Sequence, residues 1–210
     1  MIKVLIVEDD PMARKLLEIF VEGSEKYSIV HTIESAAMAE IYCFKNPIDL
    51  ILMDVCTAMD ANGLEAAKKN KKAFPKIKII IITSQPECSF LDRARSIGVD
   101  SFWYKESSAE NILAVMDKTM AGESVYPDTT PKLRLGNAMS IDFTDKELEV
   151  LRELTSGETD AVIAEKLHVS LRTVKAHIQN MRDKTGFRNR TELAVRAREC
   201  GLVINDHKPE

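Results

Sequence analysis

Charged and hydroxyl side chains stand directly after the apolar runs in the first half of the chain, at positions Glu8, Asp9, Asp54, Thr83 and Lys105. Open α/β sheets bind their ligands at the carboxyl ends of their strands, so we expect these five side chains to meet at one edge of a sheet. A cluster of carboxylates facing a lysine favours a phosphoryl site that depends on magnesium, and the threonine adds a hydroxyl. The sequence therefore predicts phosphoryl chemistry in its first half.

The elements that must position these side chains alternate along the chain. The run 4–7 is short, continuous and rich in β-branched residues, which is typical of a parallel strand covered on both faces. Apolar residues then recur at helical spacing after Pro11. The alternation continues with strands near 28–33, 50–53, 77–83 and 101–104 and with helices near 35–45, 63–74, 87–97 and 108–121. Five such βα units predict an α/β doubly wound, five-stranded parallel sheet, in flavodoxin-like order by analogy with other such sheets.

The charge of the chain is unevenly distributed. The 210 residues are 45% hydrophobic with a formal net charge of -4, which suits one or two ordinary cores but not a surface that binds polyanions everywhere. Between residues 170 and 198, only Asp183 and Glu192 are acidic. The eight basic residues of this interval are Arg172, Lys175, Arg182, Lys184, Arg188, Arg190, Arg196 and Arg198. This local excess predicts contact with a phosphate backbone.

The sequence predicts a cytoplasmic protein. Its apolar start is interrupted by acidic residues from Glu8, unlike a signal peptide, and no apolar run approaches the length of a membrane span. The four cysteines, Cys43, Cys56, Cys88 and Cys200, lack the spacing of metal ligands or of a disulfide framework. We therefore expect reduced cysteines and no membrane partner.

A domain boundary is predicted between residues 122 and 142. This interval carries two glycines and two prolines without sustained periodicity, as an interdomain linker does. We therefore expect a first domain over residues 1–121 and a second over residues 143–205.

The second domain is predicted to be all-α. Thr144 and Glu147 form a capping box in front of a helix over 145–155. A short helix over 160–167 and a longer one over 170–185 follow after tight breaks, and this pair predicts a helix-turn-helix whose second helix enters the DNA major groove. In that helix we expect an inward face made of Val174, Ile178 and Met181, and an outward face made of Arg172, Lys175, Ala176, Gln179 and Arg182.

Two sets of motifs run along nearly the whole chain. The first set lies at residues 7–11, 49–54, 83–84 and 98–105. The second set lies at residues 146–151, 163–167, 173–177 and 188–192. With these motifs the chain resembles bacterial two-component response regulators of the NarL/FixJ type, in which a phosphoacceptor receiver domain is joined to a LuxR-type helix-turn-helix domain.

The resemblance implies a phosphoacceptor and a metal ion. Asp54 would attack a phosphoryl donor and become an acyl phosphate. Magnesium would be held by Asp9, Asp54 and the main-chain carbonyl of Cys56, with Glu8 acting through water. Magnesium prefers six oxygen ligands and retains waters, and without a cation the crowded carboxylates would raise one another's pKa and repel a phosphate.

The resemblance also implies a switch. Lys105 would pair with one phosphoryl oxygen as a point charge, and Thr83 would donate a hydrogen bond to another. Thr83 would then move toward the phosphate, while Phe102, the aromatic residue three positions before the lysine, turns inward. Phe102 lacks the hydroxyl of the commoner tyrosine, so an outward position gains no phenolic hydrogen bond. The phosphoryl group shifts this equilibrium only through its different interactions with the two states.

The chain also departs from the family pattern after Asp54, at Glu106 in place of a proline that often follows the lysine, and in the second domain. After Asp54 the family carries a proline four residues on and a glycine eight residues on, whereas Ala58 and Gly63 leave no proline and one extra residue. The geometry of this loop is therefore open. In the second domain, Asp160 opens a stretch that is typically Asn-basic-acidic, so we expect a missing phosphate contact and weaker DNA binding there.

For DNA, the family and the helix geometry agree on Lys175, Ala176 and Gln179 as the residues beside base edges. Contacts with phosphates are expected from Arg172, Thr173, His177, Arg182 and Lys184. His177 is equally explained as a packing residue. The last helix, over 191–200, forms the dimer contact in the family, and its apolar stripe suits internal packing equally well.

The resemblance implies a transcription regulator that is not an enzyme. Its partners would be double-stranded DNA, a sensor histidine kinase and, in the active state, a second copy of the chain. Two alternatives stay open. One is a magnesium-dependent phosphohydrolase, which would share an aspartyl phosphate but would need a substrate domain. The other is a regulator independent of phosphorylation, in which the altered loop has removed the acceptor function of Asp54.

Overall fold

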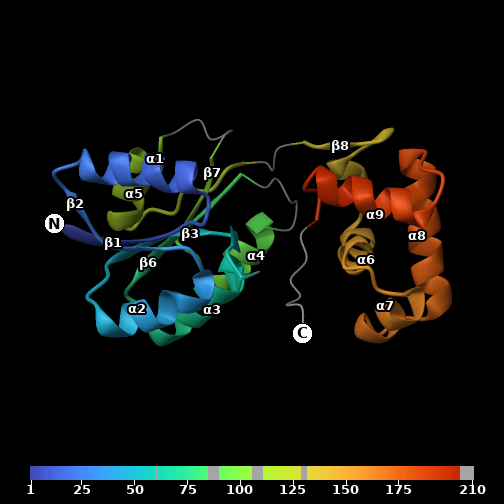
Figure 1. Ribbon diagram of the computed structural model, residues 1–210, viewed down its shortest axis with the longest axis horizontal. Coiled ribbons are helices and arrows are strands. Elements are labelled where there is room, and N and C mark those ends of the chain that lie inside the picture. The colour runs from blue at the N-terminus through green and yellow to red at the C-terminus, as the bar shows by residue number, and fades with distance from the viewer. Residues whose placement is uncertain (60, 85–89, 106–110, 129–131, 204–210) are drawn as a thin grey trace. The chain divides into compact units, whose positions relative to one another are not determined.

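The computed structural model describes residues 1–210 except residues 60, 85–89, 106–110, 129–131 and 204–210. The chain divides into two compact units (Figure 1). The first is built on residues 1–84 and 91–128, and the second on residues 132–203. Each unit has its own hydrophobic core.

A five-stranded parallel sheet forms the centre of the first unit, in the order β2-β1-β3-β6-β7 (Figure 1). Its strands are β1 (Ile2–Val7), β2 (Tyr27–Ile33), β3 (Leu50–Asp54), β6 (Lys78–Thr83) and β7 (Ser101–Tyr104). All five residues of β3 are buried, because helices cover both faces of the sheet. The predicted doubly wound sheet and its flavodoxin-like order are confirmed.

Helices pack on both faces of this sheet. On one face lie α1 (Pro11–Glu22) and α5 (Ile112–Met120), whose side chains share a core with β1, β3 and β6. On the other face lie η1 (Ala36–Met38), α2 (Ala39–Lys45), α3 (Gly63–Ala73) and α4 (Phe90–Ile97) (Figure 1). The first residues of the helices predicted over 87–97 and 108–121 lie outside the described residues.

Polar side chains fix where three of these helices begin, and thereby the loops at the carboxyl edge of the sheet. Asp10 accepts a hydrogen bond from the Ala13 N–H at 2.7 Å at the start of α1. Asn62 and Asn111 cap α3 and α5 in the same way. Each side chain replaces a partner that the first backbone N–H groups of a helix lack.

The residues that follow α5 remain attached to the first unit. The Val125 N–H donates to Ser101 Oγ at 3.0 Å, and the Phe102 N–H donates to the Val125 carbonyl at 2.8 Å. Residue 125 therefore provides the partner of one backbone N–H of β7, the edge strand.

Four helices make up most of the second unit: α6 (Asp145–Thr155), α7 (Asp160–Lys166), α8 (Leu171–Thr185) and α9 (Arg190–Glu199). The predicted capping box of Thr144 and Glu147 is present at the start of α6. Gly186, with a φ of 78°, ends α8 in the left-handed conformation that favours glycine. The three residues expected on the inward face of α8, Val174, Ile178 and Met181, are buried.

A short hairpin and a 3₁₀ turn precede these helices and were not predicted. Strands β8 (Arg134–Leu135) and β9 (Ala138–Met139) pair antiparallel, and η2 (Ser140–Asp142) follows. Leu135 and Ala138 are buried in the core of the second unit, so this hairpin adds a small element to a domain that is helical as predicted. Both ends of the predicted 122–142 linker thus contribute to folded units. Within the described part of the chain, every helix is too short or too polar to cross a membrane.

Candidate functional site

The carboxyl edge of the sheet brings the predicted acidic residues together. Strands β1 and β3 are neighbours, with Val7 paired to Met53, so the residues that end or follow them lie side by side. One carboxylate oxygen from each of Glu8, Asp9 and Asp54 lies within 4.8 Å of the others. Glu8 and Asp54 are buried, whereas Asp9 is exposed. The predicted convergence of these residues is present in the structure.

Lys105 reaches this cluster from the end of β7. Its Nζ lies 2.6 Å from Oε2 of Glu8 and 2.9 Å from Oδ2 of Asp54. Burial by itself lowers the pKa of Lys105, but Asp54 and Glu8 outweigh it and raise the pKa above its ordinary value. The ammonium therefore stays charged, and a single cation stands against two buried carboxylates.

The environment of Asp54 is set by burial and by its charged neighbours. Burial raises its pKa to about 7; Lys105 opposes this rise and Glu8 adds to it. Oδ1 accepts a hydrogen bond from the Val55 N–H at 2.6 Å, while Oδ2 contacts Lys105. The surplus of carboxylate oxygens around Asp54 suits a hard divalent cation, which binds oxygen ligands and would offset the surplus negative charge.

The loop after Asp54, whose geometry the sequence left open, forms a small hairpin. Strands β4 (Cys56–Thr57) and β5 (Ala61–Asn62) pair antiparallel, and Met59 between them has a φ of 62°. The hairpin returns the chain so that the Gly63 N–H donates to the Val55 carbonyl at 2.8 Å. A Cβ on Gly63 would lie 1.9 Å from the Asp54 carbonyl oxygen, so only glycine fits here. The extra residue is thus absorbed in the hairpin.

Three further predicted residues lie beside this cluster. Thr83 is fully buried at the end of β6, and its carbonyl accepts a hydrogen bond from the Lys105 N–H at 2.9 Å. Phe102 is 1% exposed, so its ring already lies inward in the structure. Cys56 is half-buried and stands two residues after Asp54, at the start of β4.

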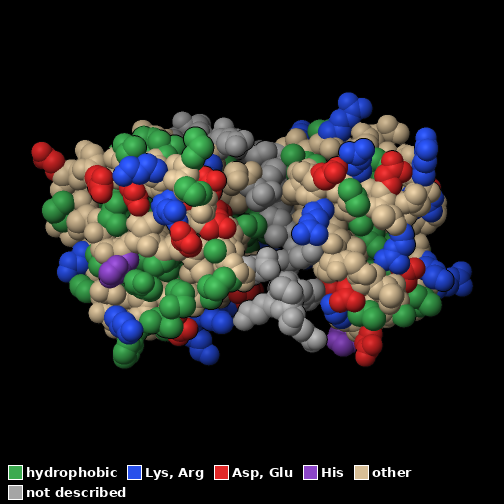
Figure 2. All heavy atoms as spheres, viewed as in Figure 1, with side chains coloured by type: hydrophobic (Ala, Val, Ile, Leu, Met, Phe, Trp, Pro, Cys, Tyr) green, Lys and Arg blue, Asp and Glu red, His purple; other side chains and the backbone are tan. Residues whose placement is uncertain are grey.

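The residues proposed to contact DNA lie on α8. Arg172, Lys175, Ala176 and Gln179 are exposed on the face opposite the buried stripe. Thr173, His177, Arg182 and Lys184 are half-buried. Figure 2 shows Lys and Arg side chains along the edge of the second unit where Figure 1 places α8.

Ion pairs with acidic residues occupy part of the predicted basic surface. Lys184 Nζ lies 2.7 Å from Oε2 of Glu147 on α6 and also donates to the Asp142 carbonyl, so it joins two helical elements. Arg190 is paired with Asp160 at 3.0 Å. Asp160, which the sequence marked as a lost phosphate contact, is therefore also the partner of a nearby arginine.

The sequence reasoning missed two contributors to the first site. It treated Gly63 as a departure from a pattern, although the closeness of its Cα to Asp54 makes a glycine necessary there. It also placed Glu8 in a cluster of carboxylates facing a lysine without a direct ion pair, whereas Glu8 makes the shorter of the two ion pairs with Lys105, at 2.6 Å. Both features depend on distances between residues that are far apart in the sequence, and the spacing of residues along the chain does not reveal such distances.

Comparison with known families agrees with both units. The model of the response regulator receiver domain matches residues 4–117, which includes every residue of the acidic cluster and Lys105. The model described as bacterial regulatory proteins, luxR family, matches residues 142–197, which includes α6 to α8 and most of α9.

Curated relatives match over almost their full length. The response regulator protein VraR of Staphylococcus epidermidis is 32% identical over 96% of this chain and 99% of its own length. VraR of Staphylococcus aureus has the same identity and coverage.

Solved structures share the fold. RcsB from Salmonella enterica serovar Typhimurium, bound to promoter P1flhDC in the presence of phosphomimetic BeF3-, is 21% identical with a TM-score of 0.64, over 93% of this chain and 97% of that chain. A structure of two RcsB dimers bound to two parallel DNAs is 20% identical with a TM-score of 0.61, over 94% of this chain and 98% of that chain. Together with the two domain matches and the full-length relatives, these findings show that the chain belongs to the response regulators that join a receiver domain to a LuxR-family domain.

Proposed function

We propose that this protein is a transcription regulator whose DNA binding is controlled by phosphorylation of Asp54. Residues 1–128 would act as the receiver and residues 132–203 as the DNA-binding domain. The observation that carries the proposal is the convergence of Glu8, Asp9, Asp54 and Lys105 at one edge of the sheet. A purely structural cluster would not need two buried carboxylates against one lysine, because their repulsion destabilises the fold.

The chemical step uses Asp54 as the nucleophile. A carboxylate oxygen attacks phosphorus, the new O–P bond forms as the bond to the leaving group breaks, and an acyl phosphate results. Lys105, already within hydrogen-bond distance of Asp54, stabilises the negative charge on the phosphoryl oxygens as a point charge. Thr83 at the end of the neighbouring strand supplies a hydroxyl for another phosphoryl oxygen.

Magnesium is the cofactor that this oxygen-rich cluster fits. Glu8, Asp9, Asp54 and the main-chain carbonyl of Cys56 would hold it, Glu8 through water, and their oxygen ligands are the type that magnesium prefers. When bound, the ion offsets the charge of the carboxylates and of the entering phosphoryl group.

A sensor histidine kinase is the proposed phosphoryl donor, and the cytoplasm is the proposed compartment. The receiver-domain match supports the kinase as partner. Thr83 and Phe102 form the proposed switch, which the phosphoryl group biases through contacts that only one state makes. Because Phe102 is buried in the structure, we propose that it shifts within the core and does not enter it from solvent.

The proposed DNA-binding element is α8. Lys175, Ala176 and Gln179 would approach base edges, since all three are exposed on the face away from the core. The proposed phosphate contacts are Arg172, Thr173, His177, Arg182 and Lys184. Lys184 is the weakest member of this set, because its ammonium is already paired with Glu147.

The active form is proposed to be a homodimer. RcsB, which shares the fold, has been solved as dimers on DNA. Two copies of α8 would then enter successive major grooves, with half-sites about one helical turn apart. The last helix, α9, would supply the contact between the two DNA-binding domains.

DNA binding by the full chain tests this function. Fluorescence anisotropy on a duplex selected from random DNA should show at least about tenfold higher affinity after treatment with acetyl phosphate and magnesium. Asp54→Asn should show no such gain. An acyl phosphate that forms without a change in DNA affinity would instead support a regulator independent of phosphorylation.

A variant on α8 tests the DNA-reading face. Lys175→Ala should cost about 1–3 kcal/mol on the selected site and relax the preference at one base pair. Arg182→Ala should weaken selected and scrambled DNA alike and flatten the salt dependence. Lys146→Ala, which removes an exposed lysine on α6, serves as the control. An unchanged ratio of selected to scrambled binding in Lys175→Ala would remove Lys175 from base readout.

A further inference from the structure

A row of side chains runs from the phosphoryl site along one face of the sheet. In the register of β6 and β7, Thr83 pairs with Tyr104 and Ile81 pairs with Phe102. Paired residues of parallel strands point to the same face, so Thr83, Tyr104 and Phe102 share a face. Ile80, Ile82 and Trp103 alternate with them and pack on the opposite face, against α1 and α5.

The row continues past the sheet into the segment after α5. The rings of Tyr104 and Phe102 are 4.9 Å apart in an edge arrangement, and the rings of Phe102 and Tyr126 are stacked at 6.4 Å. Both separations fall within the range in which aromatic pairs attract. Arg95 of α4 lies 5.0 Å from the centre of the Tyr126 ring. The Tyr126 ring therefore contacts both Phe102, the aromatic residue of the proposed switch, and the guanidinium of Arg95 on α4.

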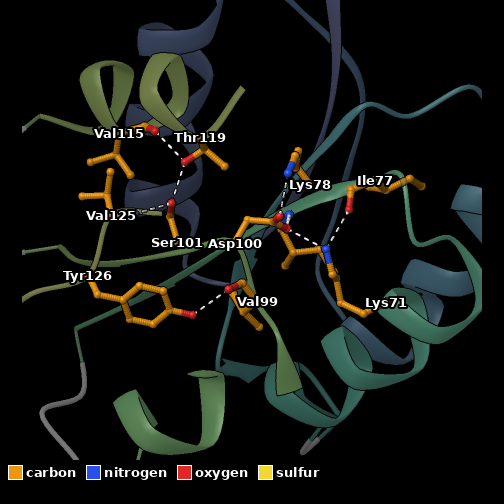
Figure 3. A network of polar contacts seen from close by, with 11 residues as sticks. Lys71, Ile77, Lys78, Val99, Asp100, Ser101, Val115, Thr119, Val125 and Tyr126 are labelled. Atoms are coloured by element: carbon orange, nitrogen blue, oxygen red, sulfur yellow. Dashed lines mark hydrogen bonds and ion pairs between the residues drawn. The ribbon is translucent and has the colours of Figure 1, made fainter. Parts of the chain in front are cut away.

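Hydrogen bonds fix Val125 to β7 and Tyr126 to Val99, two residues before that strand (Figure 3). The Tyr126 hydroxyl donates to the Val99 carbonyl at 2.7 Å. Burial raises the pKa of Tyr126 to about 12, so this hydroxyl remains a donor at neutral pH. The Val125 N–H donates to Ser101 Oγ, which in turn lies 2.7 Å from the hydroxyl of Thr119 on α5 (Figure 3). The chain is thus held at residues 125 and 126 before it continues toward the second unit.

We propose that Tyr126 is a positioning residue that keeps Phe102 in place and couples it to the chain leading out of the receiver, so that phosphorylation of Asp54 releases Val125 from β7 and Tyr126 from Val99. The proposal rests on the function proposed above. It adds a residue outside the proposed switch, and it names the segment through which the receiver state reaches the second unit.

The direction of the effect follows from the order of the row. A phosphoryl group on Asp54 draws the Thr83 hydroxyl toward it, away from Tyr104. Tyr104 and then Phe102 move into the space that is vacated, since buried side chains leave no voids. Phe102 thereby loses its stacking with Tyr126. The hydrogen bonds at Val125 and Tyr126 then open more often, which frees the segment that leads to the DNA-binding domain.

Hydrogen exchange of the full chain measures this release. Two amides report on it: the Phe102 N–H, which donates to the Val125 carbonyl, and the Val125 N–H. After treatment with acetyl phosphate and magnesium, peptides containing these amides should exchange about tenfold faster than in the untreated protein. Intact mass is recorded on the same samples to establish that the phosphoryl adduct has formed.

Variants at Tyr126 separate coupling from simple packing. Tyr126→Leu should exchange fast in both states, and its untreated form should bind DNA nearly as well as treated wild type. Tyr126→Phe keeps the ring and loses one hydrogen bond, so it should retain most of the difference between the states. Tyr42→Leu removes another half-buried tyrosine, which contacts His31 outside the row, and should behave as wild type.

Each outcome decides the proposal. Equal exchange at Val125 and Phe102 in the two states, with the adduct present and DNA affinity raised, overturns the relay and leaves the proposed function intact. A Tyr126→Leu variant that keeps the wild-type gain in DNA affinity also overturns it. Absence of the adduct on Asp54 overturns both proposals together. Should Tyr126→Leu not fold, the wild-type exchange in the two states decides alone.

Discussion

Two charged clusters lie at opposite ends of the strands of the same sheet, and their balances of charge are opposite. At the carboxyl edge, Lys105 lies between Glu8 and Asp54. At the amino edge, Asp100 lies between Lys71 and Lys78, at 2.8 and 2.9 Å (Figure 3). The first cluster has two carboxylates for one ammonium, and the second has one carboxylate for two.

The two clusters differ in how far their hydrogen bonds and ion pairs stabilise the charged form of the central carboxylate. Burial by itself raises the pKa of Asp100, but hydrogen bonds from Lys71, the Ile79 N–H and Lys78 outweigh it and hold the pKa below its ordinary value. The pKa of Asp54 is raised to about 7, because its burial is not fully offset by Lys105. A carboxylate stabilised by the fold serves structure. A buried carboxylate whose charged form the fold disfavours, such as Asp54, fits the proposed role of binding a cation and accepting a phosphoryl group.

The largest expected difference concerns stability. Asp100→Asn leaves two partly buried lysines without their carboxylate and should destabilise the first unit by about 3 kcal/mol. Asp54→Asn removes one of two crowded charges and should change stability by less than about 1 kcal/mol, or raise it. Urea unfolding of the full chain, followed by the fluorescence of Trp103, reports the first unit, since this is the sole tryptophan and lies in β7. Equal losses in the two variants would contradict the comparison.

The next effect concerns signalling. Thr83→Ala and Lys105→Ala should still allow some phosphorylation of Asp54, but should reduce the gain in DNA affinity on phosphorylation by about tenfold. Lys78→Ala, at the other edge, should keep the full gain in whatever protein remains folded. Gel shifts with and without acetyl phosphate, together with light scattering for dimerisation, compare the three. A full response in Thr83→Ala and Lys105→Ala would mean that the signal leaves the site by another route.

The smallest effect concerns pH. Because the pKa of Asp100 is lower in the folded than in the unfolded chain, its carboxylate stabilises the fold above about pH 4, and this stability is lost as the pH falls through the folded pKa. Lys71→Met should raise that pKa toward its ordinary value. The variant should therefore lose about 1 kcal/mol less than wild type between neutral and acid pH.

Urea unfolding at both pH values measures this loss. Lys69→Met, an exposed lysine of the same helix, is the matched control and should follow wild type. The same acid loss in Lys71→Met and wild type would show that Lys71 does not hold the carboxylate in its charged form.

The sequence predicted the carboxyl edge better than the loops and ion pairs around it. Short apolar runs marked the strands, and the carboxyl ends of parallel strands lie at a common edge, so Asp54 and Lys105 could be brought together from their positions after these runs. The β4–β5 and β8–β9 hairpins are too short to give a periodic pattern. The pairing of Lys184 with Glu147 joins residues far apart in sequence, and no local pattern reports such contacts.

The 122–142 interval illustrates the same limit. Its glycines and prolines are typical of a linker, and they say nothing of what the apolar residues between them touch. Val125 packs against the core of the first unit, and Leu135 packs in the core of the second. Its composition predicts a linker over the whole interval, whereas the packing of Val125 and Leu135 assigns its two ends to different folded units.

Intact mass spectrometry of the full chain tests the central claim most directly. Incubation with acetyl phosphate and magnesium should add a single phosphoryl group to wild type and none to Asp54→Asn or to wild type in EDTA, whereas Asp100→Asn should still gain it if folded. A phosphoryl adduct that persists in Asp54→Asn, or that forms equally well in EDTA, would contradict the assignment of the carboxyl edge as a magnesium-dependent phosphoacceptor site.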